Sequence, residues 1–250
     1  MIIPDPEALA QDFWAGTGLH DIFPRKIEQA APLKLPLVPV PLSRLTVPTI
    51  EHWLQQRGIA TPLPDDSCDL RGCLVALRGH GFIFVCDADN PEEQRLTIAH
   101  EVAHFLMDYL LPRQQVMRAL GTDMAAVLDG LRPPTPAERA AAILSYVRLG
   151  AHVHILPRPG ISGEEDGVVA HVEDRDDRLA LELVAPRACA GDVLSRLIEP
   201  TGVTPNDVRL GLANYFGLPL YAFDEAIQRL FRRPRPFFIM DIVTGLRRQR

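Results

Sequence analysis

The chain has 250 residues, 47% of them hydrophobic, which is enough to bury one large core or a core with an appended module. Its 26 Lys and Arg against 32 Asp and Glu give a net charge of −6, which argues against nucleic acid or an anionic membrane as the main partner. The four cysteines form no C-x-x-C pair, so we expect reduced thiols and a cytoplasmic protein. The first residues resemble no secretion signal and no apolar run is long enough for a bilayer, so we expect neither export nor a membrane partner.

The first third of the chain is predicted to be a lead-in followed by a small antiparallel unit. Residues 5–30 are predicted to be helical, and the five prolines between residues 32 and 48 predict an extended connector that is neither helix interior nor central strand. A short helix is predicted over residues 49–58, because Gly58 is placed to end it. Strands are predicted over residues 72–77 and 82–86, and the glycine-bearing link between them favours a β-hairpin.

The next segment carries the most informative motif of the sequence. Asn90 and Pro91 supply an N-cap and a first helical residue, and apolar residues recur at steps of three and four beyond them. The predicted helix contains His100-Glu101-Val102-Ala103-His104, which matches the two-histidine zinc signature of metallopeptidases. Histidines four apart lie on one helix face, so both imidazoles can bind one metal ion, and Glu101 can reach a metal-bound water as general base.

The rest of the chain is predicted to be mainly helical. Helices are expected over residues 114–120, from Thr135 to about residue 149, over residues 174–184, and from Thr204 onward. Strands are expected over residues 153–156 and 168–172, around a glycine-rich acidic turn. Residues 212–220 are typical of a helix, turn, helix junction.

A zinc held by two histidines needs a third protein ligand, and the best candidate is Glu173. If residues from Glu173 onward are helical, Glu173 and Asp177 share one face. One carboxylate can then bind the metal while Asp177 hydrogen-bonds a ligand histidine. Acidic residues are also common in a first helical turn, and Asp174, Asp176 or Asp177 remain alternatives to Glu173 as ligand.

The stretch from Leu45 to Leu230 resembles the ImmA/IrrE family of metallo-endopeptidases. The resemblance rests on three segments, which are the Trp53 helix with the hairpin, residues 95–105 around the motif, and residues 173–186. The last segment resembles the acidic helix of the family, with its glutamate ligand and Leu-Leu-x-Pro ending. Asp176 stands where that helix usually has alanine, and the stretch between His104 and Glu173 is longer than the resemblance implies.

This resemblance implies a thermolysin-like layout, a Zn²⁺ ion, or Mn²⁺ in its place, and a protein substrate. Members of the family typically cleave a helix-turn-helix transcriptional repressor that controls phage, mobile-element or stress genes. We therefore expect an α+β fold, with a minimal zinc-peptidase core and a small β-sheet beside the motif helix over residues 49–186. Residues 1–48 would be the lead-in and connector, and residues 187–250 a helical, helix-turn-helix-like extension.

Several features leave alternatives open. The donor that stabilises a developing oxyanion is not ranked by the sequence; its candidates are Tyr109, Tyr146, His152, His154 and His171. His152 and His154 are alternate strand residues, which is weak evidence for a second metal site, and we interpret them, like His20, His52 and His80, as satisfied or solvent-facing. An inactive zinc sensor or scaffold is one rival function. A DNA-binding regulator is the other, suggested by the junction at residues 212–220 and by arginines 232, 233, 235, 247, 248 and 250, although apolar helix faces explain that junction more simply. The oligomeric state is not predicted.

Overall fold

The structure is a computed structural model that describes residues 5–64, 68–144, 147, 149–158, 167–199 and 202–224, without the side chains of residues 167–174. Its centre is a four-stranded mixed sheet with strand order β1-β3-β2-β4. The strands are β1 (Leu37–Leu42), β2 (Leu70–Leu77), β3 (His80–Cys86) and β4 (His152–Pro157). β1 runs parallel to β3, and the other pairs are antiparallel. The predicted α+β fold with a small sheet is confirmed.

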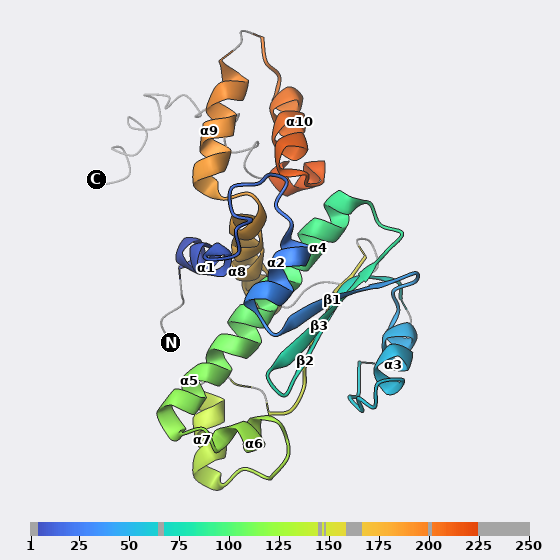
Figure 1. The fold of residues 1–250 in the computed structure, drawn as a ribbon, viewed down its shortest axis with the longest axis vertical. Helices are drawn as coiled ribbons and strands as arrows, with labels where there is room; N and C mark the ends of the chain where they lie inside the picture. The colour runs from blue at the N-terminus through green and yellow to red at the C-terminus, as the bar shows by residue number, and fades with distance from the viewer. Residues whose placement is uncertain are drawn as a thin grey trace, which may run out of the picture.

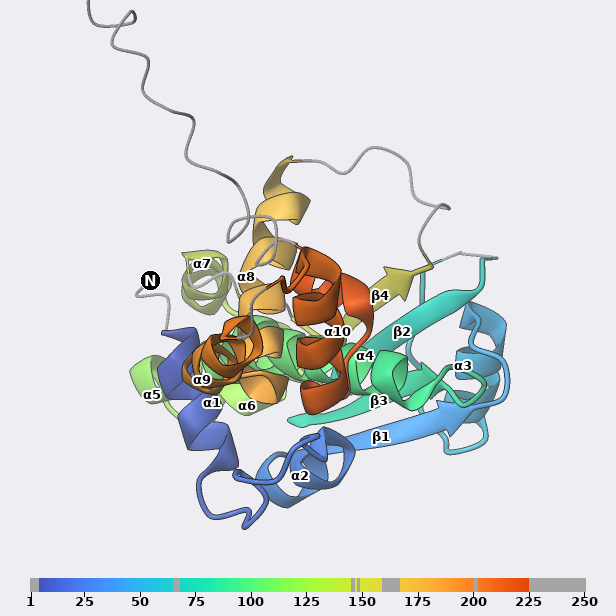
Figure 2. The same cartoon turned by 90° about the horizontal axis from the view of Figure 1, so that it is seen from above.

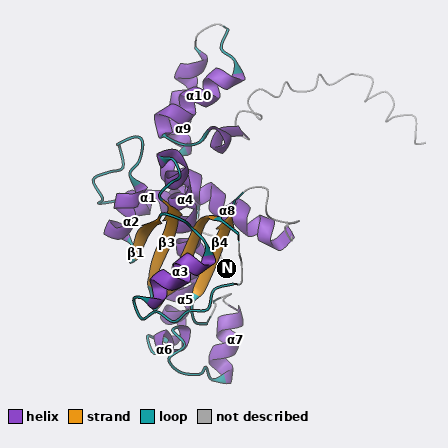
Figure 3. Cartoon of the chain, turned by 90° about the vertical axis from the view of Figure 1, so that its right-hand side faces the viewer, coloured by secondary structure: helices purple, strands orange, loops and turns teal. Residues whose placement is uncertain are grey.

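Helices cover both faces of this sheet. Helix α3 (Val47–Gln55) lies on one face, and α4 (Pro91–His104) lies on the other, where it packs against α8 (Gly167–Val184), as Figures 1 and 2 show. Helices α1 (Pro6–Trp14) and α2 (Ile27–Lys34) complete the α4 side. In the orientation of Figure 3, the remaining helices extend the molecule above and below the sheet. They are α5 (Leu111–Leu120), α6 (Met124–Leu128), α7 (Pro136–Leu144), α9 (Arg187–Ile198), α10 (Pro205–Phe216) and the 3-10 helix η2 (Leu220–Phe223).

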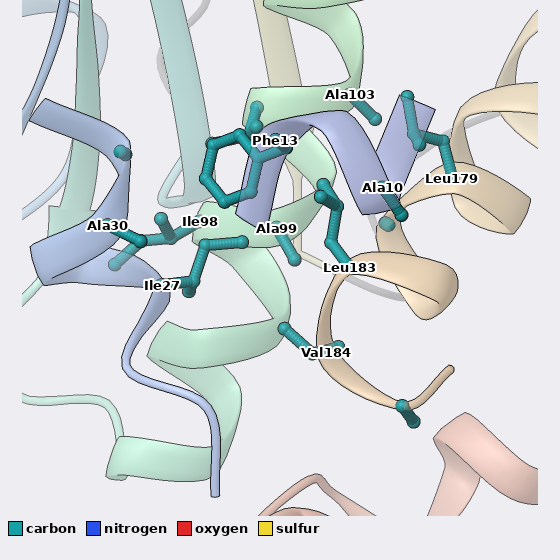
Figure 4. Packing of buried hydrophobic residues seen from close by; sticks show 14 of the residues in the cluster. Ala10, Phe13, Ile27, Ala30, Ile98, Ala99, Ala103, Leu179, Leu183 and Val184 are labelled. Carbon is teal, nitrogen blue, oxygen red and sulfur yellow. The ribbon is translucent and has the colours of Figure 1, made fainter. Parts of the chain in front are cut away.

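The two faces of the sheet contribute side chains to two separate hydrophobic cores, because successive side chains of a strand point to opposite faces. Leu74, Ala76, Ile83 and Val85 belong to the larger core, which also contains buried residues of α1, α2, α4 and α8. Figure 4 shows how Phe13, Ile98, Ala99 and Leu183, among others, meet between these four helices. The opposite set packs under α3, where Trp53 lies against Phe84 with ring centroids 5.2 Å apart. Helix α4 is therefore fixed between the sheet and α8.

Local sequence signals account for the elements next to the site. The predicted hairpin is confirmed, with Arg78 (φ 50°) and Gly79 (φ 81°) forming a two-residue turn of the kind that matches strand twist. Asn90 caps α4 as predicted, its side chain accepting a hydrogen bond from the Glu93 amide at 2.9 Å. Directly after His104 the helix continues as a π-helical turn, η1 (Phe105–Leu110), before α5 begins. Such turns re-aim side chains and are frequent at functional sites.

Three sequence-based expectations were wrong. Within the predicted helical lead-in of residues 5–30, residues 15–26 are not helical and connect α1 to α2. The proline-rich stretch is not only a connector, because Pro32 lies inside α2 and Pro39 and Pro41 lie in β1. β1 is an edge strand, and prolines at alternate positions can point their missing N–H groups away from β3. Residues 168–172 form the start of α8 rather than a strand. Extending an existing helix by valines costs only tenths of a kcal/mol per residue, about 0.7 at most, so the adjoining helix outweighs their β-propensity.

Helix α10 begins at the cap that the sequence predicts. Thr204 and Asp207 form a reciprocal capping box at the start of α10, and Gly217 ends it in the left-handed conformation with φ 59°. The predicted junction over residues 212–220 is thus α10, a turn, and the short η2. Among the described residues, no helix has the length and apolar character needed to cross a membrane.

Candidate metal centre

The two motif histidines lie on one face of α4, and both are almost completely buried. Their Nε2 atoms are 3.1 Å apart, and their ring planes are inclined by 62°. Two imidazole nitrogens bound tetrahedrally to one zinc at about 2.0–2.1 Å would be roughly 3.3 Å apart. The spacing of His100 and His104 therefore fits a pair of ligands to one ion.

Carboxylates on two different elements hold the other ring nitrogens. His100 Nδ1 is 2.9 Å from Asp177 Oδ1 on α8, and His104 Nδ1 is 2.8 Å from Asp108 Oδ2 on the π-helical turn. An ionised carboxylate only accepts hydrogen bonds, so each Nδ1 carries the hydrogen. This tautomer leaves the Nε2 lone pairs free to bind a metal ion and makes them more basic. Asp177 thus lies where its predicted orienting role requires, and Asp108 has the same relation to His104.

A second acidic group lies behind His104 and is balanced by an arginine. Asp176, which has no exposed surface, approaches His104 Nδ1 at 3.1 Å. Arg175 binds Asp176 through two nitrogens at 2.8 and 2.9 Å, and it also contacts Asp108. His104, Asp108 and Asp176 present ligand atoms close enough for a metal, but the Arg175 guanidinium already supplies the positive charge there. We interpret this group as an ion-pair network that supports His104.

The environment shifts the pKa of each member of this network. Burial alone would raise the pKa of Asp108, but hydrogen bonds from His104 and Arg175 lower it strongly. Burial raises the pKa of Asp176 despite its contact with Arg175. Burial alone would lower the pKa of Arg175, yet the two carboxylates raise it. The network therefore contains a firmly ionised Asp108 and Arg175.

Glu101 is fully buried between α4 and the sheet. Its Oε2 is 2.8 Å from His154 Nδ1 on β4, whereas Oε1 has no hydrogen-bond partner among the described residues. Gly72 on β2 makes room for this carboxylate, because a Cβ at that position would lie 3.0 Å from Oε1 and 2.5 Å from Thr97 Cγ2. An orphaned, buried carboxylate oxygen beside two converging imidazole nitrogens fits a base that acts on a water at a metal.

The charge state of Glu101 suits that task. Burial on its own would raise its pKa, but the charge of His154 and the hydrogen bond from it, together with His100 and His104, lower the pKa below its ordinary value. The carboxylate is therefore ionised at neutral pH and can accept a proton.

Comparison with known families agrees with this geometry. Residues 60–163 match the IrrE N-terminal-like domain of a peptidase family. The match confirms the family resemblance and supports a metallopeptidase-type domain. No curated protein and no solved structure gave a significant match to the chain. The matched stretch contains α4 and β4 and ends before α8.

The acidic helix α8 packs against α4. Glu173 lies in α8 one turn before Asp177, but its side chain and that of Asp174 lie outside the described residues. Asp176 and Asp177 both contact Nδ1 atoms, on the ring sides away from the converging Nε2 pair. Glu173 as third ligand stays a prediction, and the positions of Asp176 and Asp177 favour it over those two alternatives.

The described candidates for the oxyanion donor do not lie together in the fold. Tyr109 accepts a hydrogen bond from the Gly79 amide at the hairpin turn, 2.7 Å away, and His152 lies near the Tyr109 ring. Tyr146 and the side chain of His171 lie outside the described residues. His154 alone of the described candidates contacts Glu101 and His104. Our interpretation of His154 as merely satisfied or solvent-facing is thus too weak, since it is part of the site.

The sequence did not single out Asp108 or Arg175, and it named His154 only as one of several oxyanion-donor candidates, not as a partner of Glu101. Asp108 could have been found, because it follows His104 by four residues and such a pair shares a helix face. His154 depends on the pairing register of β4 with β2, which no local pattern fixes. The remaining histidines behave as predicted: His20, His52 and His80 contact near neighbours at exposed positions.

Proposed function

We propose that this chain is a zinc-dependent endopeptidase that hydrolyses a peptide bond, with a helix-turn-helix transcriptional repressor as substrate. The observation that carries the proposal is the convergence of His100 Nε2, His104 Nε2 and Glu101 in one buried site. His100, His104 and Glu173 would hold Zn²⁺, or Mn²⁺, which supplies a Lewis acid for the scissile carbonyl and acidifies a water.

The residues of the chain divide the remaining work. Glu101 takes a proton from the attacking water on Oε1 as the water oxygen bonds to the carbonyl carbon. The C–N bond then breaks, and Glu101 passes the same proton to the leaving amine nitrogen, so the base is regenerated. Asp177 and Asp108 keep His100 and His104 in the Nδ1-protonated tautomer throughout.

The repressor substrate is supported by the family resemblance alone. The domain match supports peptidase chemistry, and it carries no information on the bond that is cut. A co-encoded helix-turn-helix protein is therefore the substrate to test first.

The test is cleavage of that repressor by wild-type protein and two variants, with bound metal measured on each sample. Glu101→Gln keeps the shape of the side chain but cannot act as base, so metal should stay bound and cleavage should be lost. His104→Ala should lose both metal and cleavage. Cleavage that survives in Glu101→Gln would overturn the assignment of the base.

One observation favours a second candidate, an inactive zinc-binding sensor or scaffold. Asp176 replaces the alanine expected from the resemblance and adds a buried carboxylate next to His104. Bound metal without cleavage by the wild-type protein would support this candidate instead. The arginines that suggested a DNA-binding regulator lie outside the described residues.

A further inference from the structure

His154 reaches the site from the edge strand of the sheet. β4 pairs antiparallel with β2, and His154 lies opposite Leu74, whose side chain faces α4. Residues that pair directly across two antiparallel strands point to the same face. A long stretch that contains α5 to α7 and β4 separates His104 from Glu173. Through β4, this stretch places His154 beside the motif helix.

The His154 ring contacts both Glu101 and His104. Its Nδ1 is 2.8 Å from Glu101 Oε2. Its ring stacks on that of His104, with centroids 3.7 Å apart and planes inclined by 21°. Because an ionised carboxylate is acceptor-only, Nδ1 is the donor of the bond to Glu101.

The same geometry argues against His154 as a metal ligand, although the nitrogens of His100, His104 and His154 lie within 4.8 Å of one another. A metal ion lies close to the plane of every imidazole that binds it, at about 2.0–2.1 Å from the nitrogen. The nearly parallel rings of His154 and His104 share no such point, whereas the strongly inclined rings of His100 and His104 do. His154 would have to leave its positions against Glu101 and His104 to bind the same ion.

We propose that His154 is a positioning residue for Glu101, and that its Nδ1–H holds Oε2 so that Oε1 is the oxygen that receives the proton from water. This inference rests on the proposed hydrolytic function. Glu101 needs such an anchor because its other oxygen has no hydrogen-bond partner among the described residues, and Gly72 offers no side chain that could hold the carboxylate. A carboxylate fixed at one oxygen keeps its free oxygen aimed at one point, which lowers the entropic part of the barrier.

The test compares two substitutions that separate the ring from its hydrogen-bond donor. His154→Asn places an amide nitrogen where Nδ1 was and lacks the stacked ring. His154→Phe keeps a stacked ring and removes the donor. In the zinc-loaded protein we expect His154→Phe to lower kcat about 10- to 100-fold with KM little changed, and His154→Asn to recover kcat to within about fivefold of wild type. Zinc affinity, measured by competition with a chelator, should stay within about threefold for both variants.

Crystal structures of the same zinc-loaded proteins give a readout that needs no substrate. Glu101 Oε2 should stay at the position it has in wild type in His154→Asn and leave it in His154→Phe. Loss of zinc affinity in His154→Phe would overturn the proposal in favour of a ligand role, and an unmoved Glu101 with unchanged kcat would remove any role. A wild-type protein that cleaves nothing would refute the proposed function, while the position of Glu101 in the variants would still decide the role of His154.

Discussion

Asp177 on α8 accepts a hydrogen bond from His100 Nδ1 on α4 at 2.9 Å, and so joins two residues that lie 77 positions apart in the sequence. This contact ties the motif helix to the acidic helix beside the two motif histidines. The packing of the two helices and the orientation of the His100 ring are therefore linked through one side chain.

Replacing Asp177 tests that link. Asp177→Ala should weaken zinc binding about 10- to 100-fold, because His100 loses the acceptor that fixes its tautomer. Asp177→Asn retains an acceptor oxygen without the charge, so its zinc affinity should lie between those of the wild type and Asp177→Ala. A chelator competition titration measures the effect, and Asp192→Ala, at an exposed position of α9, is the control. Equal affinities for all four proteins would show that the contact does not support the metal.

The Arg175 network makes a prediction about the metal-free protein. Arg175→Ala leaves Asp108 and Asp176 facing each other without a counter-charge, which should cost about 3–5 kcal/mol. Asp176→Ala leaves Arg175 paired with Asp108 and should cost less, about 1–3 kcal/mol. Urea denaturation of the chelator-treated proteins gives both free energies of unfolding, and the reverse order would contradict the network.

Gly72 should be intolerant of any side chain. A Cβ there would lie 2.5 Å from Thr97 Cγ2, so Gly72→Ala should destabilise the protein by about 1–3 kcal/mol and displace Glu101. Adding Thr97→Ser removes that methyl group and should restore part of the stability. Gly191→Ala in α9 meets no atom within 4 Å, so it should be neutral or slightly stabilising in the same denaturation assay. A Gly72→Ala protein as stable as wild type would refute the close approach.

The sequence predicted those parts of the fold that depend on local signals. Asn90 and Pro91 predict where α4 begins, and the glycine of the Arg78-Gly79 turn predicts the hairpin, because each acts within a few residues. The valines of residues 168–172 wrongly predicted a strand. Their preference for strands is small compared with the stabilisation gained when the adjoining helix α8 continues through them. Pro39 and Pro41 correctly excluded a central strand, but prolines are compatible with an edge strand, which is what β1 is.

The site was predictable to the extent that one helix defines it. His100, Glu101 and His104 follow from their spacing, and Asp177 follows from the face it shares with Glu173. The places of His154 and Arg175 in the site depend on how β4 and α8 pack against α4 and the turn after it, and such long-range placement has no local signature. The ion-pair network also shows that the departure at Asp176 is accommodated by a neighbour, Arg175, rather than by exposure to solvent.

The direction of the Glu101 pKa shift predicts the acid side of the activity profile. A carboxyl whose pKa is lowered in the folded protein stays ionised as pH falls through its ordinary range and gains its proton only below it. Ligand histidines must be neutral to bind metal, so metal release should come first on acidification. Cleavage and bound zinc, measured together at stepped pH values, should therefore fall together. Loss of cleavage while zinc remains fully bound would contradict this order.

The most direct test of the proposed metal centre is a crystal structure of the zinc-loaded protein with anomalous data at the zinc edge. We expect one zinc about 2.0–2.1 Å from His100 Nε2 and His104 Nε2, with a Glu173 carboxylate oxygen as third ligand. Asp177 and Asp108 should still hold the Nδ1 atoms. A zinc bound at Asp108 and Asp176, or no zinc between the two histidines, would contradict the account.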